Sequence, residues 1–280
     1  MAAPESDNVE TFAIGDLSAT ALRDGTLVIP NDNEVFGVGR SPEEVATLLA
    51  AAGLPADELH LSVQPLLVKT ATRVLLFDTG AGSNMGPSAG RLPASLAAAG
   101  IDPDDITDVF ISHAHGDHVG GLLNAQGALA FPNARIHISS PEWAFLKGMD
   151  AGTAAGPHAA LVSAMAPKVI EFTPGANIIP GVVEAVEIRG HTSGHSGYLI
   201  TSGGESLLYI GDAMHHFVVS VQKPAWANSF DTDVRTAEAS RAELLARSAA
   251  SGQRIYAVHF PFPGLGEIER RADGFIWVPE

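Results

Sequence analysis

Three histidines and an aspartate stand close together near the middle of the chain. They are His113, His115, Asp117 and His118, and they follow the apolar run Val109 to Ile111. Imidazoles and carboxylates are the ligands that zinc and similar metals prefer. Four donors on so short a turn cannot all reach one tetrahedral ion, so the spacing favours two adjacent divalent metals, which can activate a bridging water for hydrolysis. The alternative is a polar turn with unrelated histidines.

More candidate donors follow other apolar, strand-like runs. These donors are Asp78, His191, Asp212 and His259. Because strand ends gather along a shared edge of a sheet, we expect these side chains to lie beside the His113 turn. The chain has no cysteine, so any metal must be held by histidine or carboxylate side chains.

The motifs resemble those of the metallo-β-lactamase-fold hydrolases. His113 to His118 reads HAHGDH and matches the HxHxDH signature, Asp78 to Gly80 matches the DTG turn, and Gly190 to His195 matches the GHTxGH turn. From about Phe12 to Pro279 the chain resembles the methyl parathion hydrolase branch. That resemblance implies an α/β fold, a four-layer αββα sandwich of two mixed β-sheets flanked by helices. It also implies two divalent metals, a homodimer, and hydrolysis of aryl esters, lactones or organophosphotriesters.

The resemblance also implies roles for the donors. The first metal takes His113, His115 and His191, the second takes Asp117, His118 and His259, and Asp212 bridges them. Asp78 lies beneath the metals and orients the histidine loop, although an Asx-turn that stabilises its own loop is the simpler alternative. His195 hydrogen-bonds within its loop. We expect zinc first, with manganese, cobalt or iron as alternatives.

The implied mechanism is attack by a hydroxide held between the two metals. One metal polarises the substrate oxygen, while Asp117 relays a proton to the leaving group. His215 follows Asp212 by three positions and assists if it faces the site. The catalytic candidates are therefore Asp117, Asp212 and His215.

The candidate substrate pocket departs from the parathion hydrolase pattern. Met85 stands where that enzyme has an aromatic gate residue, and His215 where it has leucine. Trp143, Phe145 and Phe217 are candidate pocket walls, with ordinary core packing as the alternative. These departures favour lactones or aryl and carboxylic esters, with organophosphotriesters as the alternative substrates.

Two functions of other classes remain as hypotheses. One is an iron-dependent sulfur dioxygenase on the same fold, and the other is a non-catalytic sensor whose metal site binds a ligand. Histidine at position 115 and the complete set of seven ligands favour the hydrolase over both.

Composition limits the partners of the protein. The formal net charge of −16 disfavours nucleic acid and favours a small neutral substrate. No apolar run reaches membrane-spanning length, and residues 1–11 show no signal-peptide pattern. We expect an N-terminal tail over 1–11 and one hydrolase domain over 12–280. The expected location is cytoplasmic, or periplasmic if a leader has been removed.

Several elements must position these residues. A hairpin is predicted from Phe12 to Pro30 with its turn at Arg23 to Thr26, and a second strand pair over 60–77 leads to Asp78. Ser41 and Glu44 form a capping box that predicts a helix to about Ala52. Residues 148–157 are small and aperiodic and predict a mobile loop. The last long helix is expected from Asp231 to Ser251, closed by Gly252.

Overall fold

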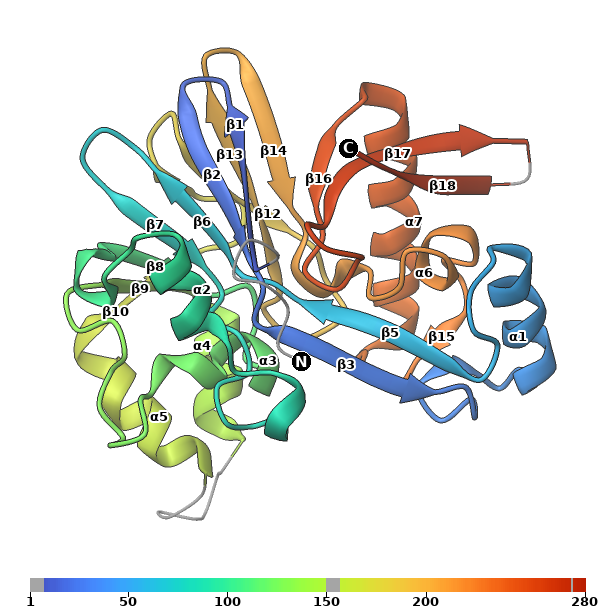
Figure 1. The fold of residues 1–280 in the computed structure, drawn as a ribbon, viewed down its shortest axis with the longest axis horizontal. Coiled ribbons are helices and arrows are strands. Elements are labelled where there is room, and N and C mark those ends of the chain that lie inside the picture. Colours follow the sequence, from blue (N-terminus) through green and yellow to red (C-terminus); the bar gives the residue numbers. More distant parts are fainter. Residues whose placement is uncertain (1–7, 150–156, 273) are drawn as a thin grey trace.

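Two large β-sheets lie face to face, with helices on both outer sides. The computed structural model describes residues 8–149, 157–272 and 274–280. Within them each large sheet has seven strands, and both sheets are mixed, with parallel and antiparallel neighbours. Figure 1 shows α2 (Leu92–Ala98), α4 (Ser140–Gly148) and α5 (Pro157–Met165) beside one sheet, and α6 (Val219–Gln222) and α7 (Val234–Ser251) beside the other. The predicted four-layer αββα arrangement is confirmed.

The first sheet carries two of the candidate motifs at its strand ends. Its strands, in spatial order, are β1 (Val9–Ile14), β2 (Leu17–Leu22), β6 (Leu66–Lys69), β7 (Val74–Phe77), β8 (Asp108–Phe110), β9 (Arg135–Ser139) and β10 (Val169–Phe172). Asp78 follows β7 directly, and the His113 turn follows β8.

The second sheet carries the remaining candidate donors. Its strands are β11 (Asn177–Ile179), β12 (Val183–Glu187), β13 (Ser196–Ser202), β14 (Glu205–Tyr209), β16 (Arg254–Tyr256), β17 (Leu265–Arg271) and β18 (Gly274–Pro279). His191 lies between β12 and β13, Asp212 follows β14, and His259 follows β16. Two small sheets pair β3 (Gly25–Pro30) with β5 (Glu58–Val63) and β4 (Phe36–Val38) with β15 (Ala227–Asn228).

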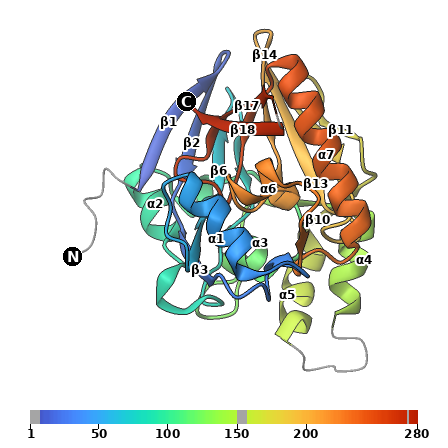
Figure 2. The same ribbon diagram turned by 90° about the vertical axis from the view of Figure 1, so that its right-hand side faces the viewer.

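Helices cover the outer faces of the sheets and the small β3–β5 pair. They are α1 (Pro42–Ala51), α2 (Leu92–Ala98), α3 (Gly116–Val119), α4 (Ser140–Gly148), α5 (Pro157–Met165), α6 (Val219–Gln222) and α7 (Val234–Ser251). In Figure 2, α7 lies along the outer side of the second sheet. None of the described helices combines the length and the apolar content needed to cross a membrane.

The core between the two sheets is aromatic where it approaches the motifs. The rings of Phe77 and Phe110 stack with centroids 4.8 Å apart, and Tyr198 packs edge-on against Phe110 at 5.4 Å. Each fully buried aromatic side chain stabilises the fold by roughly 1.5–3 kcal/mol. The hydroxyls of Tyr198 and Tyr209 donate to the Ile111 carbonyl at 2.6 Å and to Asp78 Oδ2 at 2.7 Å. The inter-sheet core therefore also supports the strand ends.

Most predicted elements are confirmed by the structure. Ser41 and Glu44 form the predicted capping box of α1. Helix α7 has Asp233 as its N-cap and ends at Gly252 in the left-handed conformation. Strands β6 and β7 pair as predicted, although β5 is a separate strand that pairs with β3.

Two predictions are wrong in detail. Residues 12–30 do not form one hairpin, because β2 pairs with β1 and β3 pairs with β5. Residues 9–11 belong to β1 rather than to a tail, and 1–7 lie outside the described residues, as do 150–156 of the predicted mobile loop.

The first error has a physical cause at Asp24. Instead of forming a turn, its buried carboxylate accepts hydrogen bonds from the amides of Ala81, Gly90 and Leu92 at 2.8–3.0 Å. Gly80, at φ +69°, leaves room for that carboxylate, since a Cβ would lie 2.5 Å from Asp24 Cγ. Asp24 thus fixes both ends of the loop between the DTG turn and α2.

Asp24→Ala should therefore destabilise the protein strongly. It leaves three amides without their acceptor, and we expect the free energy of unfolding to fall by about 3 kcal/mol in urea denaturation. Asp102→Ala is the control, because Asp102 accepts one exposed amide, that of Asp104, and its loss should cost about 1 kcal/mol or less. Equal losses in the two variants would contradict this role of Asp24.

Candidate metal centre

The candidate donors come from the ends of strands in both sheets and meet at one edge of the sandwich. The seven predicted ligands fall into two groups of side chains whose donor atoms lie within 4.8 Å of one another. The first group is His113, His115, His191 and Asp212, and the second is Asp117, His118 and His259. The expectation that separate strand ends would bring these residues together agrees with this geometry.

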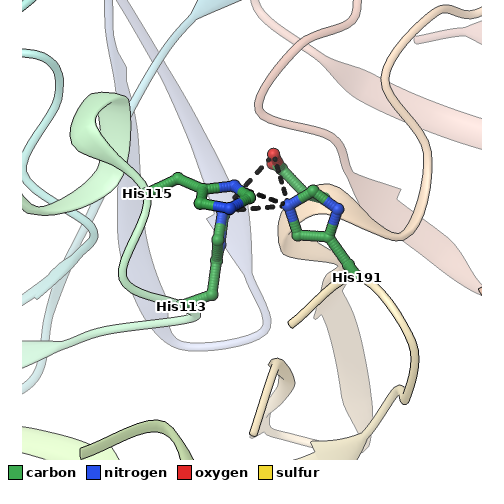
Figure 3. Close-up of side chains that lie close together, drawn as sticks. His113, His115 and His191 are labelled. Carbon is green, nitrogen blue, oxygen red and sulfur yellow. Dashed lines mark hydrogen bonds and ion pairs between the residues drawn. The ribbon is translucent and has the colours of Figure 1, made fainter. Parts of the chain in front are cut away.

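The first group is built around three convergent imidazoles. His191 Nε2 lies 3.2 Å from His113 Nε2 and 3.0 Å from His115 Nδ1. Figure 3 shows the three rings directed toward one another. The Oδ2 atom of Asp212 lies 3.5 Å from His113 Nε2 and 3.3 Å from His191 Nε2. Three ring nitrogens and one carboxylate oxygen therefore surround one point.

The second group uses the other oxygen of the same carboxylate. Asp212 Oδ1 lies 3.1 Å from both His118 Nε2 and His259 Nε2. Asp117 Oδ2 lies 3.7 Å from His118 Nε2 and 3.5 Å from His259 Nε2. Each oxygen of Asp212 thus faces a different donor group.

Divalent cations fit this arrangement. His118 Nε2 and Asp212 Oδ1 are buried and make no hydrogen bond in the described structure, although they lie close together. A buried polar atom without a partner costs free energy, and ligation by a cation would offset that cost for both atoms. Imidazole nitrogens and carboxylate oxygens are also the donor set that zinc accepts.

The electrostatics of the site agree with this fit. Burial alone would raise the pKa of the Asp212 carboxyl, but the imidazoles of His118 and His259 hold it well below its usual range. Burial, reinforced by His191, lowers the pKa of His115 to about 4. His115 is therefore neutral at pH 7, which is the form that binds a metal. Burial would also lower the pKa of His118, yet Asp212 and Asp117 raise it well above its ordinary value. The same carboxylates that favour a proton on Nε2 of His118 would favour a metal cation in its place.

Asp78 lies beneath the His113 turn and makes the contacts that its predicted role requires. Its Oδ2 accepts a hydrogen bond from His118 Nδ1 at 2.7 Å and another from the Ser112 hydroxyl at 2.6 Å. Its Oδ1 accepts the Ser112 amide at 2.8 Å. A carboxylate on Nδ1 fixes the tautomer of His118, so that Nε2 keeps its lone pair toward the donor group.

His195 makes hydrogen bonds within and beside its own loop. Its Nδ1 donates to the Ile188 carbonyl, and its Nε2 accepts the Asp212 amide, both at 2.9 Å. Burial lowers the pKa of His195 to about 3, so this ring is neutral and both nitrogens are committed to the backbone. The imidazole thereby positions the turn that carries Asp212.

Sequence reasoning missed several supporting residues. Glu142, fully buried on α4, accepts the amides of Ala114 and Gly194 at 2.8 Å, so it joins the two histidine turns of the first group. Asp231 contacts His191 Nδ1 at 3.0 Å. The Ser62 carbonyl accepts His259 Nδ1 at 2.6 Å. Glu142 and Asp231 lie in no recognisable sequence motif, so only the fold reveals their roles.

A pocket of about 370 Å³ opens over both groups, since His115 and Asp212 of the first and Asp117 and His259 of the second line it. Met85 and His215 line it, as predicted, together with Leu27, Leu61 and Phe230, which sequence reasoning missed. The sequence did hold a signal for Leu27 and Leu61. Every second residue of a strand faces the same side, so apolar residues at alternate positions of β3 and β5 share one face.

The other three predicted pocket walls lie elsewhere, which corrects the sequence-based interpretation. Trp143 is 5% exposed and packs with Phe145 in the core between the first sheet and its helices. Phe217 packs against the core of the second sheet and lines a different cavity. Ordinary core packing, the alternative at these positions, accounts for all three aromatic side chains.

A two-sheet sandwich with paired donor groups at one edge defines a class of metallohydrolase, and comparison with known proteins gives the family. The model of the metallo-beta-lactamase superfamily matches residues 61–250. The chain therefore belongs to the metallo-beta-lactamase superfamily.

Solved structures extend the likeness over almost the whole chain. AidC, a dizinc quorum-quenching lactonase in complex with a product, N-hexanoyl-L-homoserine, is 32% identical, with 98% of this chain and 97% of that chain covered and a TM-score of 0.89. AbOPH, a hydrolase of the beta lactamase superfamily, is 28% identical over the same shares with a TM-score of 0.87. The probable metallo-hydrolase Mb2322c of Mycobacterium bovis is 26% identical over 54% of this chain and 56% of its own. The chain thus spans about half the length of this curated relative.

The geometry predicts that two divalent ions bind per chain. Elemental analysis of the purified protein should saturate at two ions, and His259→Ala should lose one of them because it removes a donor of the second group. His60→Ala is the control: this exposed histidine pairs with Glu58, and its loss should leave both ions. Saturation of the wild-type protein at one ion would contradict the two-site arrangement.

Proposed function

We propose that the protein hydrolyses lactones or aryl and carboxylic esters with the help of two divalent metal ions, zinc first. One observation carries the proposal: each oxygen of Asp212 faces a different donor group, at the floor of a partly apolar pocket. His113, His115 and His191 would hold one ion, Asp117, His118 and His259 the other, and Asp212 both. Ions bound there would supply a Lewis acid for the substrate carbonyl and acidify the attacking water.

The residues around the ions would handle the proton. Asp117 lines the pocket, and its side chain is 11% exposed, so its carboxylate can reach both a bound water and a substrate. We assign to it the transfer of the proton from the attacking water to the leaving oxygen, because a pocket-lining carboxylate beside the metal ligands can accept a proton from one group and donate it to the other.

His215 is a second candidate for contact with the leaving group. Asn228 accepts the Phe230 amide with its Oδ1, so its Nδ2 donates to His215 Nδ1 at 2.8 Å. That bond leaves the proton of a neutral His215 on Nε2, which lies 3.1 Å from Asp212 Oδ2 and makes no hydrogen bond of good geometry. An N–H group at this place would donate to the oxygen of an opened ester or lactone.

The pocket walls support a small neutral substrate. Leu27, Leu61, Met85 and Phe230 offer apolar surface for an acyl chain, and the net charge of −16 disfavours anionic substrates. The likeness to AidC, a lactonase solved with a product, supports the same substrate class.

A serine nucleophile has little support in this chain. Gly86 to Gly90 reads GPSAG and fits the GxSxG pattern of serine hydrolases. However, Ser88 lies on an exposed 3₁₀ turn, and its hydroxyl donates to the Met85 carbonyl at 3.0 Å. The serine of a nucleophile elbow lies instead on a tight turn between a strand and a helix.

Organophosphotriester hydrolysis is the second candidate, because of the resemblance to the methyl parathion hydrolase branch. We favour it less, since Phe230 is the one Phe, Tyr or Trp among the described lining residues and Trp143, Phe145 and Phe217 lie outside the pocket.

The dioxygenase and sensor hypotheses gain no specific support from the geometry. A homodimer is part of the proposal through the same resemblance.

Substrate choice tests the proposed function. A planar acyl centre needs one polarised oxygen, whereas a tetrahedral triester must also seat three substituents against the pocket walls. We expect kcat/KM for the best lactone or aryl ester to exceed that for a methyl-parathion-like triester by at least ~100-fold, about 2.7 kcal/mol. The measurement is steady-state kinetics on zinc-loaded protein at one pH. A triester hydrolysed as efficiently as the best ester would contradict the assigned substrate class.

A further inference from the structure

The imidazole of His191 is supported by a buried carboxylate outside the family motifs. His191 Nδ1 donates to Asp231 Oδ1 at 3.0 Å, while its Nε2 faces His113 and His115. Asp231 is 6% exposed. Because the proton of His191 is held on Nδ1 by this bond, Nε2 keeps its lone pair toward the first donor group.

Asp231 is in turn held by a buried arginine on α7. Arg241 is 2% exposed, and its Nη2 donates to Asp231 Oδ2 at 2.7 Å. Its Nε donates to the carbonyl of Ala213, the neighbour of Asp212, at 2.9 Å, and its Nη1 to the Pro224 carbonyl at 3.0 Å. One guanidinium therefore fixes both the support of His191 and the turn that carries Asp212.

Stability alone does not account for this buried ion pair. Replacing a buried ion pair by well-packed apolar side chains is often neutral or stabilising, because the two charges lose their hydration. The pair Asp231–Arg241 is therefore better explained by what it orients. Asp231 contacts the candidate ligand His191, and Arg241 bonds the carbonyl of Ala213 beside Asp212.

The backbone around His191 is docked on the start of the same helix. The amide and hydroxyl of Thr232 donate to the His191 carbonyl at 2.9 and 2.6 Å, and the Asp233 amide donates to Gly190 at 2.9 Å. Gly190 lies so close to α7 that a Cβ would be 2.1 Å from the Ala237 nitrogen. The His191 turn thus has little freedom to move apart from α7.

We propose that Asp231, held in place by Arg241, is a positioning residue that sets the metal affinity of the first donor group independently of the second. The proposal rests on the metal centre of the proposed function. The second group has its own carboxylate support, in which Asp78 holds His118. His118 and His191 are therefore oriented through separate carboxylates, Asp78 in the inter-sheet core and Asp231 beside α7.

Stepwise metal affinities test the proposal without any activity measurement. Zinc is titrated against a chelating dye, with Asp231→Asn and Arg241→Met beside the wild-type protein. Asp231→Asn should weaken one of the two ions by at least ~10-fold and leave the other within about twofold. Arg241→Met should weaken the same ion and also the other one, because Arg241 holds the turn of Asp212, which faces both donor groups. In a His259→Ala background, which keeps only the first group intact, Asp231→Asn should weaken the remaining ion by the same factor.

Matched controls come from a second buried network without a metal group. Asp108 is fully buried and contacts His137 Nε2 at 2.9 Å and the Arg73 and Arg135 guanidiniums. Asp108→Asn should lower the melting temperature without changing either metal affinity. Arg254→Met removes an arginine that bonds Glu280 and the Ala13 carbonyl, and should behave in the same way.

Several results would overturn the proposal. They are unchanged affinities in Asp231→Asn, an equal weakening of both ions in Asp231→Asn, or the same weakening in Asp108→Asn. If Arg241→Met does not fold, Asp231→Asn decides, because it keeps the side-chain volume and a hydrogen-bond partner for Arg241. Saturation of the wild-type protein at one ion would refute the two-metal function and leave the role of Asp231 to be tested on that ion. In that case, an Asp231→Asn variant that binds the single ion as tightly as the wild-type protein would overturn the role of Asp231.

Discussion

The carboxylate of Asp212 is the constraint on which the rest of the site depends. It is 3% exposed, yet four imidazole nitrogens lie within 3.5 Å of its oxygens from the two donor groups alone. A buried anion is costly unless cations or protons compensate it. The site therefore favours a positive charge on each side of the Asp212 carboxylate. The fold places ligands for such charges by bringing strand ends of both sheets to one edge.

The supports of the ligands are distributed over every layer of the sandwich. Tyr209 reaches Asp78 from the inter-sheet core, Glu142 joins two histidine turns from α4, and Arg241 acts from α7. Fixed partners of this kind hold metal-binding imidazoles in one tautomer and orientation. The strand ends alone would place the ligands near one another, and these buried polar contacts set their directions.

Much of the fold and of the site could be predicted from the sequence, for identifiable reasons. The seven donors all follow strand-like apolar runs. Because the ends of neighbouring strands gather at one edge of a sheet, the sequence predicts that these donors meet there. The capping box of Ser41 and the closing Gly252 are local signals and were read correctly. Asp231 and Arg241 could not be assigned, because their partners lie 10 or more positions away and their own surroundings carry no motif. Asp24 was assigned to a turn, because its partners lie more than 50 positions away and Asp-Gly is a common turn pair. Trp143 and Phe145 were misjudged because an aromatic side chain fits a core and a pocket wall equally well.

The central claim is that one carboxylate lies between two metal ions. Crystals of the metal-loaded protein, with anomalous diffraction recorded on both sides of the zinc absorption edge, test it most directly. The account predicts two zinc peaks in each chain, one within the His113, His115 and His191 group and one within the Asp117, His118 and His259 group, with an oxygen of Asp212 on each. A single peak, or two peaks of which only one contacts Asp212, would contradict it.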